Sequence, residues 1–205
     1  MLFMSQAIAL FPLSQIILPQ GRMQLRVFEP RYQRLVREAQ QRPFASALLN
    51  PYVHQQHQAR IFPVVTLVRI IDFCQLPDGL LGITIEGIAR HRIIKRWQEA
   101  DQLHVAQTEA LPSWSMLELD AAFQPLVPAL QQIYQQNPQL AALYPAADWY
   151  NASWLAQRWL EVLTMPPQLK FELISADHPG PTLDVLQDWL REQQSSELAP
   201  PAQTN

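Results

Sequence analysis

The sequence of 205 residues predicts an α+β protein: a β-rich first part with one inserted helix, followed by a helical second part. Two patterns indicate this fold class. Short apolar runs rich in Val and Ile, separated by turn residues, occupy most of residues 1–112 and are typical of strands. Beyond residue 113, apolar residues recur at intervals of three and four, which predicts amphipathic helices.

The predicted strands of the first part are short, with one long exception that ends before a turn. In chain order they are Ala7–Phe11, Arg22–Val27, Phe44–Leu49, Ile61–Phe73, Leu80–Ile88, His91–Trp97 and Leu103–Ala110. Pro77-Asp78-Gly79 is a turn signal between the long strand and its return strand. Several short strands with turns between them indicate a small barrel or sandwich.

One helix interrupts the strands after Pro30. Apolar residues then fall at Tyr32, Leu35, Val36 and Ala39, the spacing of one helical face. A proline suits the first helical position because its missing N–H would be unpaired there in any case. We therefore expect a helix that begins at Pro30 and packs one face on the sheet.

The helical part begins near the border at Leu111-Pro112-Ser113. Ser115 and Glu118 have the spacing of a capping box, and Pro125 and Pro128 predict a kink or break in the helix that follows. Further helices are predicted over Asn151–Leu163, Gln168–Ser175 and Thr182–Glu192. The expected domains are thus residues 1–112 and 113–192, with a flexible tail over 193–205.

Charge is divided unevenly along the chain. Residues 1–96 hold 12 basic and 5 acidic residues, a net charge of +7, whereas residues 97–205 hold 3 and 13, a net charge of −10. We interpret the split as attraction between the two halves within the fold, in preference to a nucleic-acid surface. The pI near 5.9 also counts against a nucleic-acid binder.

The composition indicates a soluble protein in a reducing compartment, and we expect a cytoplasmic protein. Cys74 is the single cysteine, so no intrachain disulfide can form. Its neighbours predict a buried, inert thiol. No signal peptide and no apolar run of about 18 residues is present, so no membrane contact is expected.

The search for catalytic motifs predicts a protein that is not an enzyme and uses no cofactor. None of the five glycines precedes a lysine, so a Gly-Lys-Ser/Thr phosphate-binding loop is absent. Neither Lys95 nor Lys170 lies in a recognisable Ser–Lys setting. His54 and His57 are spaced as two metal ligands could be, but no third ligand is evident, and we expect a solvated pair and no metal.

Several motifs resemble, in order, one known family over residues 8–190. They are Phe11-Pro12-Leu13, Ile16-Ile17-Leu18-Pro19, Gln24-Leu25-Arg26-Val27-Phe28-Glu29-Pro30-Arg31-Tyr32, Val68-Arg69-Ile70, Gly87-Ile88-Ala89-Arg90-His91-Arg92 and Leu169-Lys170-Phe171-Glu172-Leu173-Ile174. The series is similar to the Lon N-terminal domain, the substrate-recognition part of the ATP-dependent Lon proteases. In the turn at Leu18-Pro19-Gln20-Gly21 the chain departs from the family's Phe-Pro-Gly, which predicts a turn longer by one residue.

The resemblance implies a PUA-like pseudo-barrel followed by a helical bundle, and a recognition module standing alone without motor or protease. It also implies binding of unfolded or exposed polypeptide segments. Within its most specific motif we expect structural roles. Phe28 and Tyr32 would clamp the helix to the barrel, Glu29 would complement the helix N-terminus, Arg31 would pair with an acid, and Gly87 would mark the matching strand.

Three hypotheses for function follow, in order of preference. The first is a module that binds polypeptide, with an adaptor or quality-control factor as one form of it, and the second is an RNA-binding module whose affinity would fall steeply with salt. The third is a hydrolase with an unrecognised site. The candidate binding residues form a predicted basic strip: Arg22, Arg26, Arg34 and Arg37.

Overall fold

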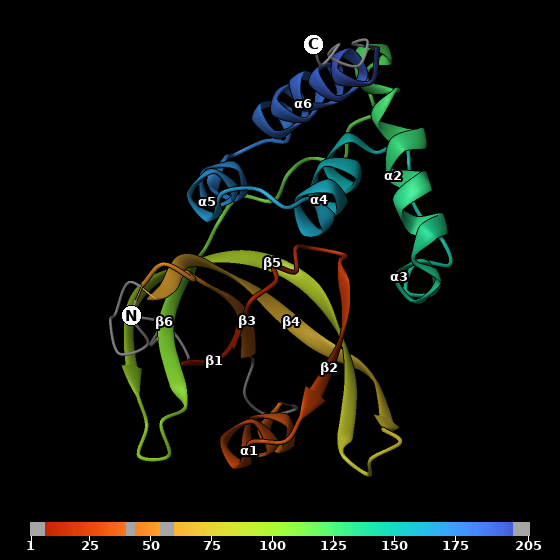
Figure 1. Ribbon diagram of the computed structural model, residues 1–205. Helices are drawn as coiled ribbons and strands as arrows, with labels where there is room; N and C mark the ends of the chain where they lie inside the picture. Colours follow the sequence, from red (N-terminus) through yellow and green to blue (C-terminus); the bar gives the residue numbers. More distant parts are fainter. Residues whose placement is uncertain (1–6, 40–43, 54–59, 199–205) are drawn as a thin grey trace, which may run out of the picture. The chain divides into compact units, whose positions relative to one another are not determined.

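The computed structural model describes residues 7–39, 44–53 and 60–198, with side chains described as far as residue 193. The chain divides into two compact units, which are treated separately below. The β-unit comprises Met1–Ser113 and Leu160–Asp177, and the helical unit comprises Trp114–Trp159 and His178–Asn205. Figure 1 shows strands in the first unit and helices in the second, which confirms the predicted α+β class.

The β-unit is built on a six-stranded sheet that closes on itself. Its strands are β1 (Ile8–Leu13), β2 (Arg22–Val27), β3 (Phe44–Leu49), β4 (Ile61–Gln75), β5 (Leu81–Gln98) and β6 (His104–Ala110). The order is β2-β5-β4-β3-β1-β6, and β6 also pairs with β5, so five strands form a ring from which β2 extends. All pairs are antiparallel except β1–β3. A barrel of this kind leaves few free strand edges.

Strand β5 is a single strand of 18 residues, whereas the sequence predicted two, Leu80–Ile88 and His91–Trp97. No turn separates them. The first half of β5 pairs with β2 and the second half with β6, and β4 runs beside both halves. Small irregularities of register between Leu67 and Val68 of β4, and between Ile93 and Lys95 of β5, replace the expected turn. Such bulges let one strand bend around a barrel.

A tight turn holds the segment before β2 against β5. The N–H of Gly21 donates to the carbonyl of Leu18 (2.8 Å), and Gln20 lies between them with a φ of 63°. The N–H of Gln20 donates to the carbonyl of Gly87, whose own N–H donates to Gly21. A Cβ at Gly87 would lie 2.1 Å from the Leu18 oxygen, so only glycine fits this approach.

Side chains alternate along β1 between two apolar clusters on opposite faces. Ala9 and Phe11 belong to a cluster that includes helix α1 (Pro30–Glu38), and Ile8 and Leu10 belong to the other. Tyr32 of α1 stacks on Phe11, with 4.2 Å between ring centroids. The helix starts at Pro30 as the spacing of apolar residues predicted, and that spacing also marks its buried face.

Helix α5 (Pro167–Ser175) and the end of α4 belong to the β-unit, although the sequence predicted one helical bundle over residues 113–192. The Glu161 carboxylate accepts a hydrogen bond from the N–H of Leu18 (2.7 Å). Phe171 stacks on Phe62 of β4, with 5.4 Å between centroids. These contacts join residues far apart in sequence, so helical periodicity alone could not assign the segment to the sheet.

Arg90 of β5 is the buried polar link of the β-unit. Its guanidinium donates to the carbonyls of Ile174 (2.5 Å) and Ala176 (2.9 Å) at the end of α5, and to that of Pro112 after β6 (2.5 Å). Burial lowers the pKa of Arg90, since the charged form is desolvated. Three carbonyls replace the lost water and fix α5 to the end of the barrel.

The helical unit contains a closed set of aromatic contacts. It is formed by the 3₁₀ turn Ala121–Phe123 and helices α2 (Leu126–Gln136), α3 (Pro138–Ala142), α4 (Ala152–Val162, up to Trp159) and α6 (Gly180–Leu198). Tyr134, Tyr144, Trp154 and Trp149 contact one another in a ring, with centroids 5.2–5.9 Å apart. The Arg158 guanidinium lies over Tyr144 and Trp154. Cation–π and edge-to-face contacts thus form part of this core.

The helical part differs from the sequence prediction in three respects. The capping box is wrong: the Asp120 side chain caps the first turn by accepting from the N–H of Ala122, and the backbone carbonyl of Ser115 accepts from the Ser153 hydroxyl. Helix α3 was not predicted. Helix α6 continues to Leu198, so the first part of the expected tail is helical, and residues 199–205 lie outside those described. The predicted break near Pro125 is confirmed by the start of α2.

Candidate functional site

Arg22, the first of the predicted binding arginines, is part of a cross-strand ion triad. Glu86 of β5 lies directly opposite Arg22 of β2 and Arg69 of β4. Arg22 Nε contacts the carboxylate at 2.8 Å, and Arg69 contacts it through Nη2 at 2.5 Å and Nε at 3.1 Å. Opposite charges directly across a sheet stabilise the strand pair. Arg22 is therefore engaged within its own sheet.

The triad sets the protonation of Glu86. Burial alone would raise the pKa of this carboxyl, but hydrogen bonds and charge from Arg69 and Arg22 outweigh burial, so the pKa of Glu86 is lowered. Its side chain is only 12% exposed, whereas that of Arg69 is 64% exposed. The carboxylate is the charged centre that holds both arginines.

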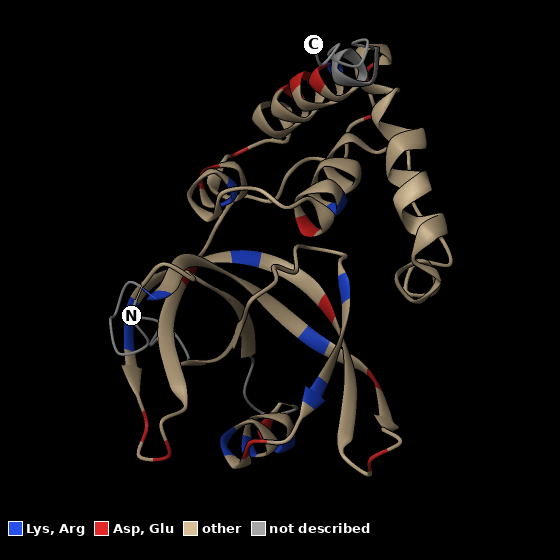
Figure 2. Cartoon of the chain, in the orientation of Figure 1, with Lys and Arg blue, Asp and Glu red and all other residues tan. Residues whose placement is uncertain are grey.

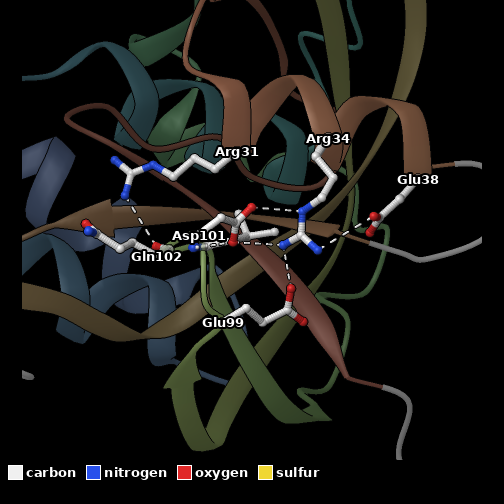
Figure 3. Close-up of polar contacts among 7 residues, drawn as sticks. Arg31, Arg34, Glu38, Glu99, Asp101 and Gln102 are labelled. Atoms are coloured by element: carbon white, nitrogen blue, oxygen red, sulfur yellow. Dashed lines mark hydrogen bonds and ion pairs between the residues drawn. The ribbon is translucent and has the colours of Figure 1, made fainter.

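Arg26 and Arg34 also meet acids within the β-unit. Arg26 of β2 forms an ion pair with Asp78 in the β4–β5 turn. Arg34 of α1 contacts Glu99 and holds Asp101 through Nε at 2.9 Å, and both acids lie in the β5–β6 turn. Figure 3 shows Arg34 between these carboxylates. The cluster joins α1 to the hairpin, and the acidic partners raise the pKa of Arg34.

Arg37 differs from the other three predicted binding arginines. It is exposed in the last turn of α1, where a positive charge complements the helix C-terminus, and no acid among the described residues pairs with it. Figure 2 shows blue segments on β2 and α1, with red segments in the hairpin turns of the same unit. The structure thus brings acids to three of the four arginines and leaves no continuous basic strip there.

The motif Phe28–Tyr32 is partly as expected. Tyr32 is buried, but Phe28 is 60% exposed, so the predicted clamp of two aromatic residues is wrong for Phe28. It lies just before α1 and does not belong to the buried cluster that contains Tyr32. Glu29 occupies the N-cap without a side-chain cap and pairs with Arg31 at 2.6 Å. That pair confirms the expected acid partner of Arg31, which also donates to the Gln102 carbonyl (Figure 3).

Cys74 is exposed, which contradicts the predicted buried thiol. It lies on the final part of β4, past Val68, the last residue of β4 that pairs with β3, and residues 71–75 are all exposed. His54 and His57 lie outside the described residues. Within the described ranges, no group of three or more His, Cys, Asp and Glu is placed to hold a metal ion. No described helix is both long and apolar enough to cross a membrane.

The end of β4 carries apolar side chains that the sequence did not identify as a site. Ile71 is 40% exposed and Phe73 is 57% exposed, with Asp72 between them. Strand β3 pairs with β4 only as far as Val68, so the later residues extend past it. One signal was present: the predicted strand Ile61–Phe73 is far longer than Phe44–Leu49, the predicted strand before it, so these two could not pair along the whole of the longer one.

Comparison with known proteins assigns this architecture. The family model of the ATP-dependent protease La (LON) substrate-binding domain matches residues 7–192. A Lon N-terminal domain protein from Xanthomonas campestris has 26% sequence identity and a TM-score of 0.70, over 90% of this chain and 98% of that chain. The N-terminal domain of Lon protease from the Mycobacterium avium complex is 14% identical with a TM-score of 0.59, over 90% and 97% of the two chains. No curated protein matches the chain.

The family match supports a substrate-recognition module, a class of protein whose surface binds another molecule. The particular family follows from the match over most of the chain: this protein belongs to the ATP-dependent protease La (LON) substrate-binding domain family. The resemblance that the sequence motifs suggested is thereby confirmed.

Proposed function

We propose that the protein binds exposed apolar segments of non-native polypeptide and acts as an adaptor or quality-control factor, without chemistry of its own. The observation that carries the proposal is the family match over residues 7–192, because the family is described as a substrate-binding domain and not as a catalytic one. Its described relatives among solved structures are Lon N-terminal domains.

The ion pairs of the predicted binding arginines favour polypeptide over nucleic acid as their ligand. A protein that binds phosphates needs cations that are free to exchange counterions for them. Here Arg22, Arg26 and Arg34 are each engaged by carboxylates, while Ile71 and Phe73 are exposed apolar groups. We propose direct partner contact for Arg37, the one of the four predicted arginines with which no described acid pairs.

A titration measured by fluorescence anisotropy tests the proposal. The ligands are a permanently unfolded, labelled model protein, the same protein in its folded form, and a labelled single-stranded RNA. We expect binding of the unfolded form only, with an affinity that changes less than about twofold when salt is raised about fourfold. Binding to nucleic acid would instead weaken by orders of magnitude over that range.

Two outcomes would overturn the proposal. Binding of RNA alone, with a steep salt dependence, would favour the nucleic-acid hypothesis. Release of peptide fragments or other turnover of the unfolded protein would favour the hydrolase. An Arg37→Glu variant identifies the part played by that arginine, with Arg191→Glu in helix α6 as the matched control, because both residues are exposed helical arginines.

A further inference from the structure

Among the described residues, the last part of β4 is paired on one side only, and its register against β5 shifts between Ile70 and Asp72. Phe44 of β3 lies opposite Val68, and among the described residues no strand of the β-unit lies beside Arg69–Gln75 except β5. In Figure 1 this part of β4 leads to the tip of the β4–β5 hairpin. The outward backbone groups of such an edge can pair with an added strand.

Of the charged side chains discussed along this edge, Asp72 is the one without an ion-pair partner among the described residues. Arg69 is held by Glu86, and Asp78 at the hairpin tip is paired with Arg26. Asp72 is exposed, and among the described residues no cation lies within ion-pair distance of it; its carboxylate accepts the N–H of Phe73 at 2.9 Å. The edge therefore presents one uncompensated negative charge between two exposed apolar side chains.

We propose that the edge Arg69–Gln75 binds a client by strand addition, and that it selects extended segments in which a basic residue is flanked by apolar ones. This inference rests on the proposed function and names the class of segment bound. Ile71 and Phe73 supply apolar contact, the backbone supplies hydrogen bonds, and Asp72 pairs with the basic residue of the client.

The same carboxylate disfavours a second copy of the chain as the occupant. An antiparallel pairing of two such edges centred on Asp72 places two carboxylates directly opposite each other, and like charges in that position are destabilising. Charges on exposed edges are a common means of preventing self-association. Asp72 thus discriminates between a client with a basic residue and another copy of the edge.

Binding of three labelled heptapeptides to the full chain tests the inference. The first alternates valine and threonine around a central lysine, the second has a central glutamate, and the third is the lysine peptide with N-methyl groups on alternate amides. We expect the lysine peptide to bind about two- to fivefold tighter than the glutamate peptide. N-methylation should weaken binding more than about tenfold, because it removes several backbone donors and keeps the side chains.

Substitution of the aspartate locates the site. Asp72→Lys should reverse the preference between the two charged peptides, and Asp72→Asn should abolish it. Asp184→Lys, an equal change of charge at an exposed position of α6, should leave it unchanged. Amide exchange should slow within Arg69–Gln75 when the lysine peptide is bound, which identifies the edge even if a variant folds poorly.

Failure of this inference is distinguishable from failure of the proposed function. If the unfolded model protein binds, but N-methylation has no effect or Asp72→Lys keeps the original preference, strand addition at this edge is refuted and polypeptide binding stands. If neither the unfolded protein nor any peptide binds, the proposed function itself is refuted. Dimerisation through protected Arg69–Gln75 amides would identify a second copy as the occupant.

Discussion

At the scale of single residues, Glu86 is the acid on which two arginines from neighbouring strands depend. Glu86→Gln keeps the shape of the side chain and removes the charge that both guanidinium groups contact. We expect the free energy of unfolding at neutral pH to fall by about 1–2 kcal/mol. Urea unfolding of the two proteins measures it, with Glu109→Gln, an exposed position on β6, as the control.

The pH dependence of that difference has a definite sign. The pKa of Glu86 is lower in the folded state than the ordinary value of about 4.5. At a pH between the folded-state pKa and the ordinary pKa, the unfolded state therefore binds more protons than the folded state. The stabilisation is therefore complete above about pH 4.5 and is lost as the pH falls through the folded-state pKa. The gap between the wild-type chain and Glu86→Gln should narrow in acid; a gap that stays constant would contradict this role of the charge.

Gln20 holds a conformation that suits glycine better. Its φ is 63°, in the left-handed region, and its side chain gains no hydrogen bond that the described structure shows. Gln20→Gly should raise the free energy of unfolding by about 0.5–1 kcal/mol, the balance of relieved strain and glycine's greater freedom when unfolded. Gln24→Gly, at an extended exposed position in β2, should lower it in the same urea experiment. Destabilisation by both changes would refute the assignment of strain to Gln20.

At the scale of elements, the packing of α1 on the sheet depends on Tyr32, one of the two aromatic residues in the motif Phe28–Tyr32. Tyr32→Ala removes a buried ring stacked on Phe11 and should cost about 3–5 kcal/mol of stability. Phe28→Ala removes a ring that is 60% exposed and should cost less than about 1 kcal/mol. Thermal or urea unfolding of the two variants measures both losses of stability. Similar losses for Tyr32→Ala and Phe28→Ala would support the predicted clamp of both rings, and a much larger loss for Tyr32→Ala would contradict it.

Most elements of the β-unit could be predicted from the sequence because each is encoded locally. The β2 strand Arg22–Val27 and the start of α1 follow from neighbouring residues and from one proline. The continuity of β5 could not be predicted, because it depends on β2, β4 and β6 lying beside it. For the same reason the sequence identified the arginines but not the acids with which they pair. Glu86 is 64 residues from Arg22 in the sequence, and only the strand register makes them neighbours.

At the scale of the whole molecule, the division of charge looks different once the units are known. Glu99 and Asp101 belong to the acidic half of the sequence but lie in the β-unit, where they contact Arg34. Counted over the units, the β-unit has 13 basic and 11 acidic residues, a net charge of +2, and the helical unit has 2 and 7, a net charge of −5. The steep contrast of the sequence halves is thus largely compensated inside the β-unit, which weakens the case for a nucleic-acid surface.

The division into units also predicts how the chain tolerates truncation. Residues 1–113 lack the segment Leu160–Asp177, so Phe62 loses its stacking partner Phe171, and Arg90 loses the carbonyls of Ile174 and Ala176. Each buried donor left unpaired costs about 1–3 kcal/mol, so we expect this fragment to be at least about 3 kcal/mol less stable than the β-unit in the full chain.

Addition of a peptide covering residues 160–177 should restore the fragment in part, since it supplies both the ring and the carbonyls. Urea unfolding and amide-proton dispersion with and without the peptide measure the effect, and a scrambled peptide is the control. A fragment of residues 1–113 that unfolds cooperatively with the stability of the full chain would show instead that the sheet needs no help from α5. In that case the border at residue 112 predicted from sequence would describe the folding unit better than the contacts of Arg90 do.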